Sequence, residues 1–298
     1  NVLHKQIQLR YKMFSEELYM SNTVILENSF LATMKNPNDP AMLKQNAIHT
    51  TEGASRYGFG GALVGGVTLY GWCIPSILQA MGIEWLDDGW IHVMFRRPTY
   101  PGTQVQFVVT KDDEGTHHFV ATKDDGEACL RGTLGLGKAH WLDTLQLSNN
   151  LNPDPVLDNR KFLTIDNAPV GEDLRTFAFE ISEAYANETG VDAGDVQGLF
   201  TGENPLVHPS LIARQMMSLL AHSYDYGHPA IHVSSHVQNF KRAEAGQTFI
   251  LTGHFVETYE KRGHHYAICD GALFDASGTE IARIRHTNIY KVAQQNAT

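Results

Sequence analysis

Residues 46–54 have the sequence Asn46-Ala47-Ile48-His49-Thr50-Thr51-Glu52-Gly53-Ala54, and the run Tyr57-Gly58-Phe59-Gly60-Gly61-Ala62-Leu63-Val64-Gly65-Gly66-Val67-Thr68-Leu69-Tyr70 follows. The first stretch is a polar loop that delivers an Asn and a His three residues apart. The second is apolar and rich in glycine, and it predicts a buried helix over residues 61–81. Pro75 is expected to kink or split this helix, because proline donates no backbone hydrogen bond. If the chain has a catalytic site, we expect it in this region.

Strands are predicted after the helix. Residues 91–95, 104–109, 118–122 and 128–136 are apolar runs, most of them alternating, separated by short polar turns, most of which contain glycine. This pattern is typical of an antiparallel meander. The turn between the first two strands is basic, since it begins with Arg96 and Arg97. Residues 1–45 give a weaker signal, in which only 4–13 alternate loosely like a strand.

The same order of elements returns after a polar segment over residues 146–172, which predicts a linker. Residues 204–208 form a second Asn/His loop, and Pro209 then favours the start of a second helix. Strands follow at 231–237, 248–258, 265–270 and 280–292, with a basic turn at Lys241 and Arg242. The chain therefore contains a diverged duplication, with halves at residues 1–145 and 173–298. Because a long apolar helix cannot remain exposed, we expect an α+β fold in which each antiparallel sheet wraps around its own helix and the two sheets pair.

Composition excludes several classes of protein. The 298 residues include 42% hydrophobic and 19% charged residues, which is ordinary for a globular protein. The formal net charge of −10 argues against nucleic acid as a partner, because phosphate binding needs a basic surface. No apolar stretch approaches ~18 residues, so no membrane association is expected. Cys73, Cys129 and Cys269 are far apart and form no CxxC motif, which suggests reduced thiols and a cytoplasmic protein.

The twice-repeated order of loop, helix and strands resembles the double hotdog architecture. The specific match is to the MaoC-like (R)-specific enoyl-CoA hydratase/dehydratase family, whose signature has an Asp, then Asn-Pro-apolar-His, and later a His-Gly-Met-like turn. Asn46, Ile48 and His49 match the second part, with Ala47 in place of Pro. Residues 64–67 match the glycine turn. The resemblance covers most of the chain from about residue 46.

The chain also departs from the family pattern. In the second half Asn204, Pro205 and His208 match loosely, with one extra residue before the His. The catalytic Asp of the family falls on Lys44 in the first half and on Gly202 in the second. The Asp/His dyad that the resemblance implies for adding water to an enoyl thioester is therefore not intact.

Candidate site residues follow from the loop and the helix start. His49 is the candidate acid/base, because histidine titrates near neutral pH; the alternative is a histidine that caps the loop. Asn46 is the candidate water ligand, or a plain turn residue. Glu52 is a candidate substrate-binding carboxylate, or an acid at a helix N-terminus. Gly65 and Gly66 either let a backbone N–H approach the thioester oxygen or allow tight packing.

Basic and histidine residues provide further candidates. Arg96, Arg97 and Arg242 are predicted to bind the phosphates of coenzyme A, or serve only solubility. His232 and His236 are expected on one face of a strand, but no further ligand spacing supports a metal site. The sequence has no GxGxxG followed by a helix, no P-loop and no GxSxG, and no cofactor is expected.

The leading hypothesis is a hydratase/dehydratase that interconverts an enoyl-CoA and a 3-hydroxyacyl-CoA. An acyl-CoA thioesterase of hotdog type is the alternative enzyme, with Glu52 as the local carboxylate. A non-catalytic acyl-CoA-binding protein is the third hypothesis, because both halves lack the Asp. The chain carries its own pair of halves, so a monomer and a homodimer both remain open.

Overall fold

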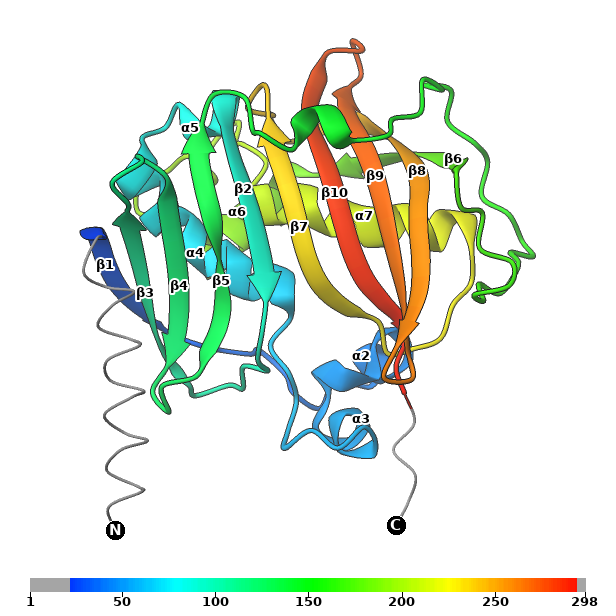
Figure 1. Ribbon diagram of the computed structural model, residues 1–298, viewed down its shortest axis with the longest axis horizontal. Coiled ribbons are helices and arrows are strands. Elements are labelled where there is room, and N and C mark those ends of the chain that lie inside the picture. The colour runs from blue at the N-terminus through cyan, green and yellow to red at the C-terminus, as the bar shows by residue number, and fades with distance from the viewer. Residues whose placement is uncertain (1–21, 294–298) are drawn as a thin grey trace.

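The computed structural model describes residues 22–293, in which ten strands form one antiparallel sheet (Figure 1). The strand order across the sheet is β1-β3-β4-β5-β2-β7-β10-β9-β8-β6. The first five strands are β1 (Thr23–Leu31), β2 (Gly89–Phe95), β3 (Gln104–Lys111), β4 (His117–Lys123) and β5 (Ala128–Leu136). The others are β6 (Glu172–Ile181), β7 (Ile231–Asn239), β8 (Gln247–Lys261), β9 (His264–Asp275) and β10 (Glu280–Lys291). The expected α+β class and the antiparallel strands are confirmed.

The two halves share a single sheet, which corrects the expectation of two separate ones. β2 of the first half pairs with β7 of the second, in the register Trp90↔Gln238 to Met94↔Ser234. Each of these strands would otherwise be an edge with unpaired backbone N–H and C=O groups. Pairing them satisfies those groups and joins the halves, so the sheet is continuous from β1 to β6.

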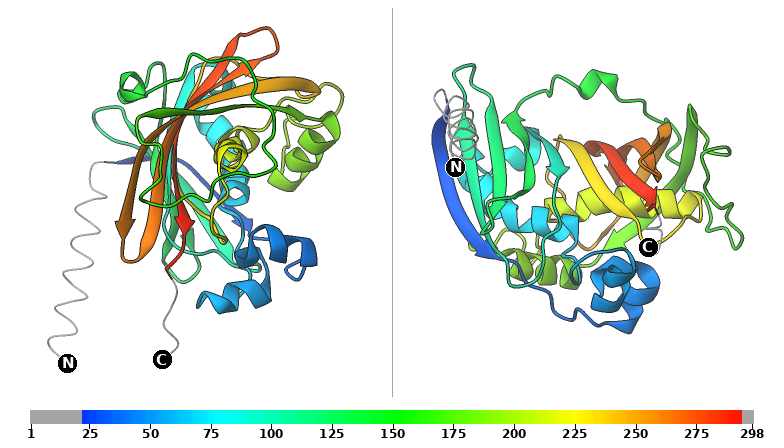
Figure 2. Two further views of the ribbon diagram at one scale, coloured as in Figure 1. Left: turned by 90° about the vertical axis from the view of Figure 1, so that its right-hand side faces the viewer. Right: turned by 60° about the horizontal axis from the view of Figure 1, so that its bottom comes forward.

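Two long helices, α4 (Gly66–Met81) and α7 (Pro209–Ser223), lie against the same side of this sheet (Figure 2, left). α4 begins five residues later than predicted, and it continues through Pro75 without a break. α7 begins at Pro209 as expected. Its predicted apolar stripe is confirmed as buried, with Leu211, Ile212, Met216, Leu219 and Leu220 all in the core.

Short helices complete the described chain. They are α2 (Pro40–Gln45), η1 (Ala47–His49), α3 (Thr51–Arg56), α5 (Trp85–Asp88), η2 (Leu142–Thr144) and α6 (Glu183–Ala193). β1 and α6 were not predicted, and the loose alternation at residues 4–13 lies outside the described residues. Residues 146–171 contain no strand or helix and run from η2 to β6. None of the helices within residues 22–293 is both long and apolar enough to cross a bilayer. The three cysteines are buried free thiols.

Candidate active site

The segment from α2 to α3 carries the Asn/His loop and lies at one end of the molecule, near the lower ends of β2 and β7 (Figures 1 and 2). The side chain of Thr50 caps α3 by accepting a hydrogen bond from the Gly53 N–H at 3.1 Å. Ile48 and Leu63 pack together with Ile231 of β7 in a small apolar cluster. This packing holds the first-half loop against β7 of the second half.

His49 is oriented by a backbone carbonyl. Its Nδ1 lies 2.8 Å from the Leu63 carbonyl oxygen. A carbonyl only accepts, so Nδ1 bears the proton, and Nε2 of the neutral ring has a lone pair that accepts a long hydrogen bond of 3.4 Å from Asn46 Nδ2. Burial lowers the pKa of His49 below its usual value, the Leu63 carbonyl opposes this shift, and the charge of Arg214 adds to it. The ring is therefore held neutral, with an unprotonated nitrogen available as a base.

Asn46 lies directly beside that nitrogen. Its Nδ2 is 3.4 Å from His49 Nε2 and donates to the Ala230 carbonyl oxygen at 2.9 Å. Its Oδ1 is buried and has no hydrogen-bond partner within residues 22–293. Asn46 Oδ1 is thus an unpaired acceptor, and His49 Nε2 accepts only the long bond from Asn46 Nδ2, which a bound water can replace. A water molecule has two O–H donors to match them, and this would leave its oxygen lone pairs free to attack an electrophile.

Gly65 and Gly66 lie at the start of α4, next to His49. A Cβ placed on Gly65 would be 3.6 Å from His49 Cε1, which is ordinary contact. A Cβ on Gly66 would be 3.0 Å from the Phe95 ring, so Gly66 allows the helix to pack closely on β2. Backbone N–H groups in the first turn of a helix have no partner within the helix. The helix start therefore offers hydrogen-bond donors, and Gly65 places it next to His49.

Glu52 is not brought to His49. It is exposed on α3 and forms an ion pair with Arg56, one turn later. Lys44, which stands where the family has its Asp, is exposed on α2. The ring partners of His49 among the described residues are the Leu63 carbonyl and Asn46, so no carboxylate is hydrogen-bonded to it there.

The three arginines proposed for coenzyme A do not lie together. Arg97 is exposed and lies 3.5 Å from Glu127, and Arg96 is also exposed beside it. Arg242 instead binds Asp87 through its Nε and Nη2 atoms. Asp87 precedes β2 and Arg96 follows it, so they are roughly 20 Å apart along the seven-residue strand. Arg242 is thus occupied at the opposite end of β2.

His232 and His236 lie on opposite faces of β7, which corrects the expectation of a shared face. The register with β10 shifts between Thr287 and Asn288, because β7 has one extra residue at this bulge. His236 stacks on His92, with ring centroids 3.7 Å apart. His232 instead packs on Phe95 at 4.3 Å. No group of three or more His, Cys, Asp or Glu side chains in the part of the chain described is arranged to hold a metal ion.

The bulge also brings polar residues together that the sequence analysis missed. The hydroxyl of Ser235 lies between His232 Nε2, at 2.8 Å, and His286 Nδ1, at 3.0 Å. His286, Asn288 and Tyr290 alternate along β10, and all three are buried. Polar residues at alternate, core-facing positions of a strand are a signal that the sequence itself contains.

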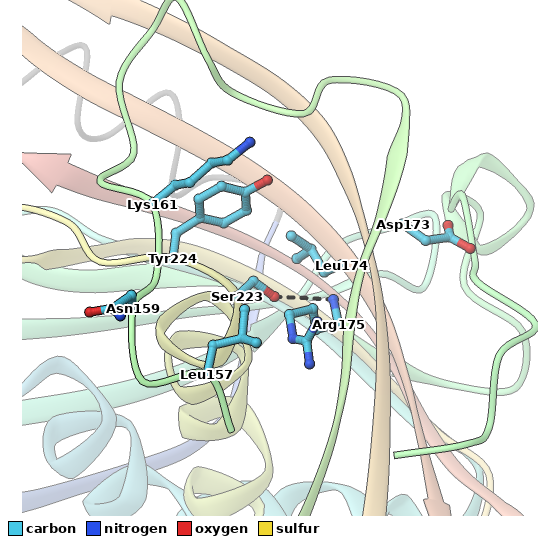
Figure 3. Close-up of a pocket in the computed structure, with 8 residues that line it drawn as sticks. All are labelled: Leu157, Asn159, Lys161, Asp173, Leu174, Arg175, Ser223 and Tyr224. Carbon is cyan, nitrogen blue, oxygen red and sulfur yellow. Dashed lines mark hydrogen bonds between the residues drawn. The ribbon is translucent and has the colours of Figure 1, made fainter. Parts of the chain in front are cut away.

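A cavity of about 260 Å³ lies elsewhere, between the linker, β6 and the end of α7 (Figure 3). Lys161, Arg175 and Tyr224 line it, and the Arg175 N–H donates to Ser223 Oγ at 3.1 Å. Its lining comes from the second half and the linker alone. It therefore contains none of the predicted site residues.

Buried histidines predict a loss of stability in acid. Burial lowers the pKa of both His208 and His286 to about 3, and these side chains are 0% and 2% exposed. In the unfolded chain these histidines take up protons near pH 6.5, but in the folded chain they do not. The stability of the fold is therefore unaffected by them above pH 6.5 and decreases as pH falls toward 3. Each should reduce the free energy of unfolding by about 1.4 kcal/mol per pH unit between these limits.

Urea unfolding at a series of pH values measures this slope. His208→Asn is the matched variant, since Asn keeps an acceptor for the Ser210 N–H at the start of α7 but does not titrate. We expect its slope to be smaller by about one proton. An unchanged slope would mean that His208 is not kept neutral by burial.

Comparison with known proteins identifies the fold. No family model and no curated protein matches the sequence. Solved structures do match, and they show that the chain has the double hotdog fold and resembles MaoC-like dehydratases.

Three examples, each with a TM-score above 0.5, illustrate the likeness. One, described as a MaoC-like dehydratase, is 14% identical with a TM-score of 0.60, and the match covers 91% of this chain and 98% of the other. A MaoC domain protein dehydratase of Chloroflexus aurantiacus is 11% identical, with a TM-score of 0.59 and coverage of 91% and 95%. A conserved hypothetical protein of Mycobacterium tuberculosis, described as a double hotdog, is 9% identical with a TM-score of 0.54 and coverage of 88% and 95%. At these identities the likeness concerns the fold, and the chemistry must be argued from the site.

Proposed function

We propose that the protein is a hydratase/dehydratase that interconverts an enoyl-CoA and a 3-hydroxyacyl-CoA. The observation that carries this proposal is the contact of two acceptor-bearing side chains, in which Asn46 Oδ1 is unpaired and His49 Nε2 accepts only a long, 3.4 Å bond from Asn46 Nδ2. They match the two O–H donors of one water molecule. The likeness of the fold to MaoC-like dehydratases agrees with this reaction.

In this mechanism His49 carries out both proton transfers. Its Nε2 takes a proton from the bound water as the water oxygen forms a bond to C3 of the enoyl thioester. The electron pair of the double bond moves onto the thioester oxygen, where first-turn N–H groups of α4 at Gly65 and Gly66 stabilise the negative charge. The His49 imidazolium then returns the proton to C2. The reverse sequence removes water, and neither direction needs an acid at Lys44.

Arg96 and Arg97 are the proposed contacts for the phosphates of coenzyme A. Both are exposed and follow β2, whose last residue, Phe95, packs on Gly66 at the start of α4. We also propose a cytoplasmic location, which the three buried free thiols support. The direct test of function is hydration of a panel of trans-2-enoyl-CoAs, followed by loss of the conjugated thioester absorbance. Absence of turnover across the panel would contradict the proposal.

The pH dependence of hydration should show the titration of His49. The base must be neutral to accept a proton, so kcat/KM falls as pH drops through the pKa of His49 in the free enzyme. Because burial lowers that pKa, we expect the acid limb to have its midpoint below pH 6.5. The measurement is kcat/KM against pH, with the fold checked by circular dichroism at each pH. A midpoint above 6.5 would be inconsistent with a buried, neutral His49.

One other function has a specific observation in its favour. His49 has no carboxylate hydrogen-bonded to it in residues 22–293, which fits a non-catalytic acyl-CoA-binding protein. That function predicts saturable binding of acyl-CoA without turnover. The thioesterase alternative has less support, because Glu52 is exposed and paired with Arg56. Release of free thiol from saturated acyl-CoA would distinguish a thioesterase from both other functions.

A further inference from the structure

A buried polar cluster lies on the helix-facing side of the sheet, on strands of the second half. It consists of His232 and Ser235 on β7 and of His286 and Asn288 on β10. His232 and Asn288 are directly paired across the two strands, and the rings of His232 and His286 are 4.2 Å apart. Ser235, His286 and Asn288 are 0%, 2% and 1% exposed. Four polar side chains are thus gathered where apolar packing would be expected.

The cluster is adjacent to the proposed active site. Asn46 donates to the carbonyl of Ala230, two residues before His232. Phe95 packs against the His232 ring and also against Gly66 at the start of α4. One aromatic ring therefore separates the cluster from the helix start that would hold the thioester carbonyl. An acyl chain attached to that carbonyl would have to pass this ring to reach the cluster.

Three polar atoms of the cluster are left without partners. His232 Nδ1, His286 Nε2 and Asn288 Nδ2 are all buried, and none has a hydrogen-bond partner in the described part of the chain. An unpaired buried polar atom costs about 1–3 kcal/mol. Three such atoms in contiguous side chains indicate a bound hydroxyl-bearing group, either an ordered water or a ligand hydroxyl that replaces it, that completes their hydrogen bonds.

The chemistry of the missing group follows from counting protons. The Ser235 hydroxyl has one proton, so it donates to one histidine and accepts from the other. The hydrogen bonds through Ser235 can run in either direction. In both cases one of the two ring nitrogens that face away from Ser235, His232 Nδ1 and His286 Nε2, bears a proton and the other has a lone pair. With Asn288 Nδ2 the cluster offers two donors and one acceptor. A hydroxyl group, with two lone pairs and one proton, satisfies all three.

A charged group does not fit this cluster. Burial lowers the pKa of His286 to about 3 and that of His232 well below its usual value, so both rings are neutral. A carboxylate placed here would be buried against neutral partners, at a large desolvation cost. A keto oxygen has no proton to give to the free histidine lone pair.

We propose that the acyl group of the substrate carries an uncharged hydroxyl beyond the reacting carbons, and that His232, His286 and Asn288 bind it. This inference rests on the proposed function, because it takes the ligand to be an acyl thioester. The hydroxyl is distinct from the one that hydration creates at C3, which forms beside His49. The substrate class is accordingly a hydroxylated enoyl-CoA rather than a plain aliphatic one.

Equilibrium binding tests the inference separately from turnover. Saturated acyl-CoAs of equal length, plain or with one hydroxyl placed at successive carbons beyond C3, are titrated calorimetrically into the full chain. We expect one hydroxyl position to bind about 10–100-fold more tightly than the plain chain, which corresponds to one or two hydrogen bonds gained. Equal affinity at every position, or no binding of any acyl-CoA, would overturn the inference. Failure to hydrate enoyl-CoAs with the binding preference intact would overturn only the proposed reaction.

Two variants test whether the cluster residues cause the preference for the hydroxylated acyl chain. Asn288→Leu removes an unpaired polar atom at similar volume, so it should fold with an equal or higher urea midpoint, whereas His286→Phe also removes the bond from His286 Nδ1 to Ser235 and should lower stability by about 1 kcal/mol. Both should reduce the preference for the hydroxylated chain to near unity. His236→Phe is the matched control, because it lies on the opposite face of β7 against His92 and should leave the preference unchanged. A preference that survives both cluster variants would show that the hydroxyl binds elsewhere.

Discussion

Replacing His49 with alanine should lower kcat/KM for enoyl-CoA hydration by about 10²–10⁴-fold, the usual contribution of a positioned general acid–base group. His49 is the side chain that holds an unprotonated nitrogen beside the unpaired Asn46 oxygen. Alanine removes that nitrogen and the hydrogen bond to Leu63. Asn46 remains, so the variant should still hold a water but have no base to take its proton. The measurement is the initial rate of hydration under kcat/KM conditions.

Stability must be measured alongside, because the lost hydrogen bond to Leu63 costs about 1 kcal/mol. The control is His140→Ala, which removes an exposed histidine that packs edge-on against Trp90 and should change neither rate nor unfolding midpoint. If His49→Ala retains wild-type hydration while folded, the proposed mechanism is wrong. Saturable acyl-CoA binding without turnover, in the wild type itself, would instead support the binding protein.

Much of the fold could be predicted from the sequence because its signals are local. Alternation along residues 128–136 marks β5 with its observed bounds, and Pro209 marks the start of α7. The Asn/His spacing also places Asn46 and His49 in contact, since three residues of a short loop cannot separate them far. These predictions depend on neighbours within a few residues, whereas the equally local expectation that Pro75 would break the helix was wrong.

The errors arose where distant segments meet. The pairing of β2 with β7 joins residues nearly 150 positions apart, and no local pattern indicates which edges will pair. The bulge in β7 reversed the face of His232, because one extra residue flips every side chain on one side of it. Arg242 was predicted to bind the phosphates of coenzyme A because it lies in a basic turn. Its partner, Asp87, lies 155 residues earlier in the sequence.

Glu52 illustrates a different limit. Its distance from His49 in sequence is small, but it sits on α3 with its side chain toward solvent and Arg56. In a short helix, direction matters as much as spacing. Gly53, the next residue, is buried against η1 instead. The residue of α3 with the strongest influence on the site is therefore the glycine rather than the acid.

Gly53→Ala should misplace His49 and lower kcat/KM by about 10²-fold or more. A Cβ at Gly53 would lie 2.1 Å from the Ala47 carbonyl oxygen and 2.6 Å from the Ala47 Cβ, so α3 and η1 cannot keep their present contact. Ala47 begins the turn that ends at His49. A shift of about 1 Å in a catalytic group is enough for such a loss. Overpacking should also reduce the free energy of unfolding by about 1–3 kcal/mol.

Ser55→Ala is the matched control, since Ser55 lies on the exposed side of the same short helix and should keep the wild-type rate. The pH profile separates displacement from simple unfolding. If the His49 ring moves away from Leu63 toward solvent, its pKa should rise toward its ordinary value, and the acid limb of the residual activity should move to higher pH. A folded Gly53→Ala variant with full activity would show that the loop tolerates the added methyl group. The close packing of α3 on η1 would then not be what positions His49.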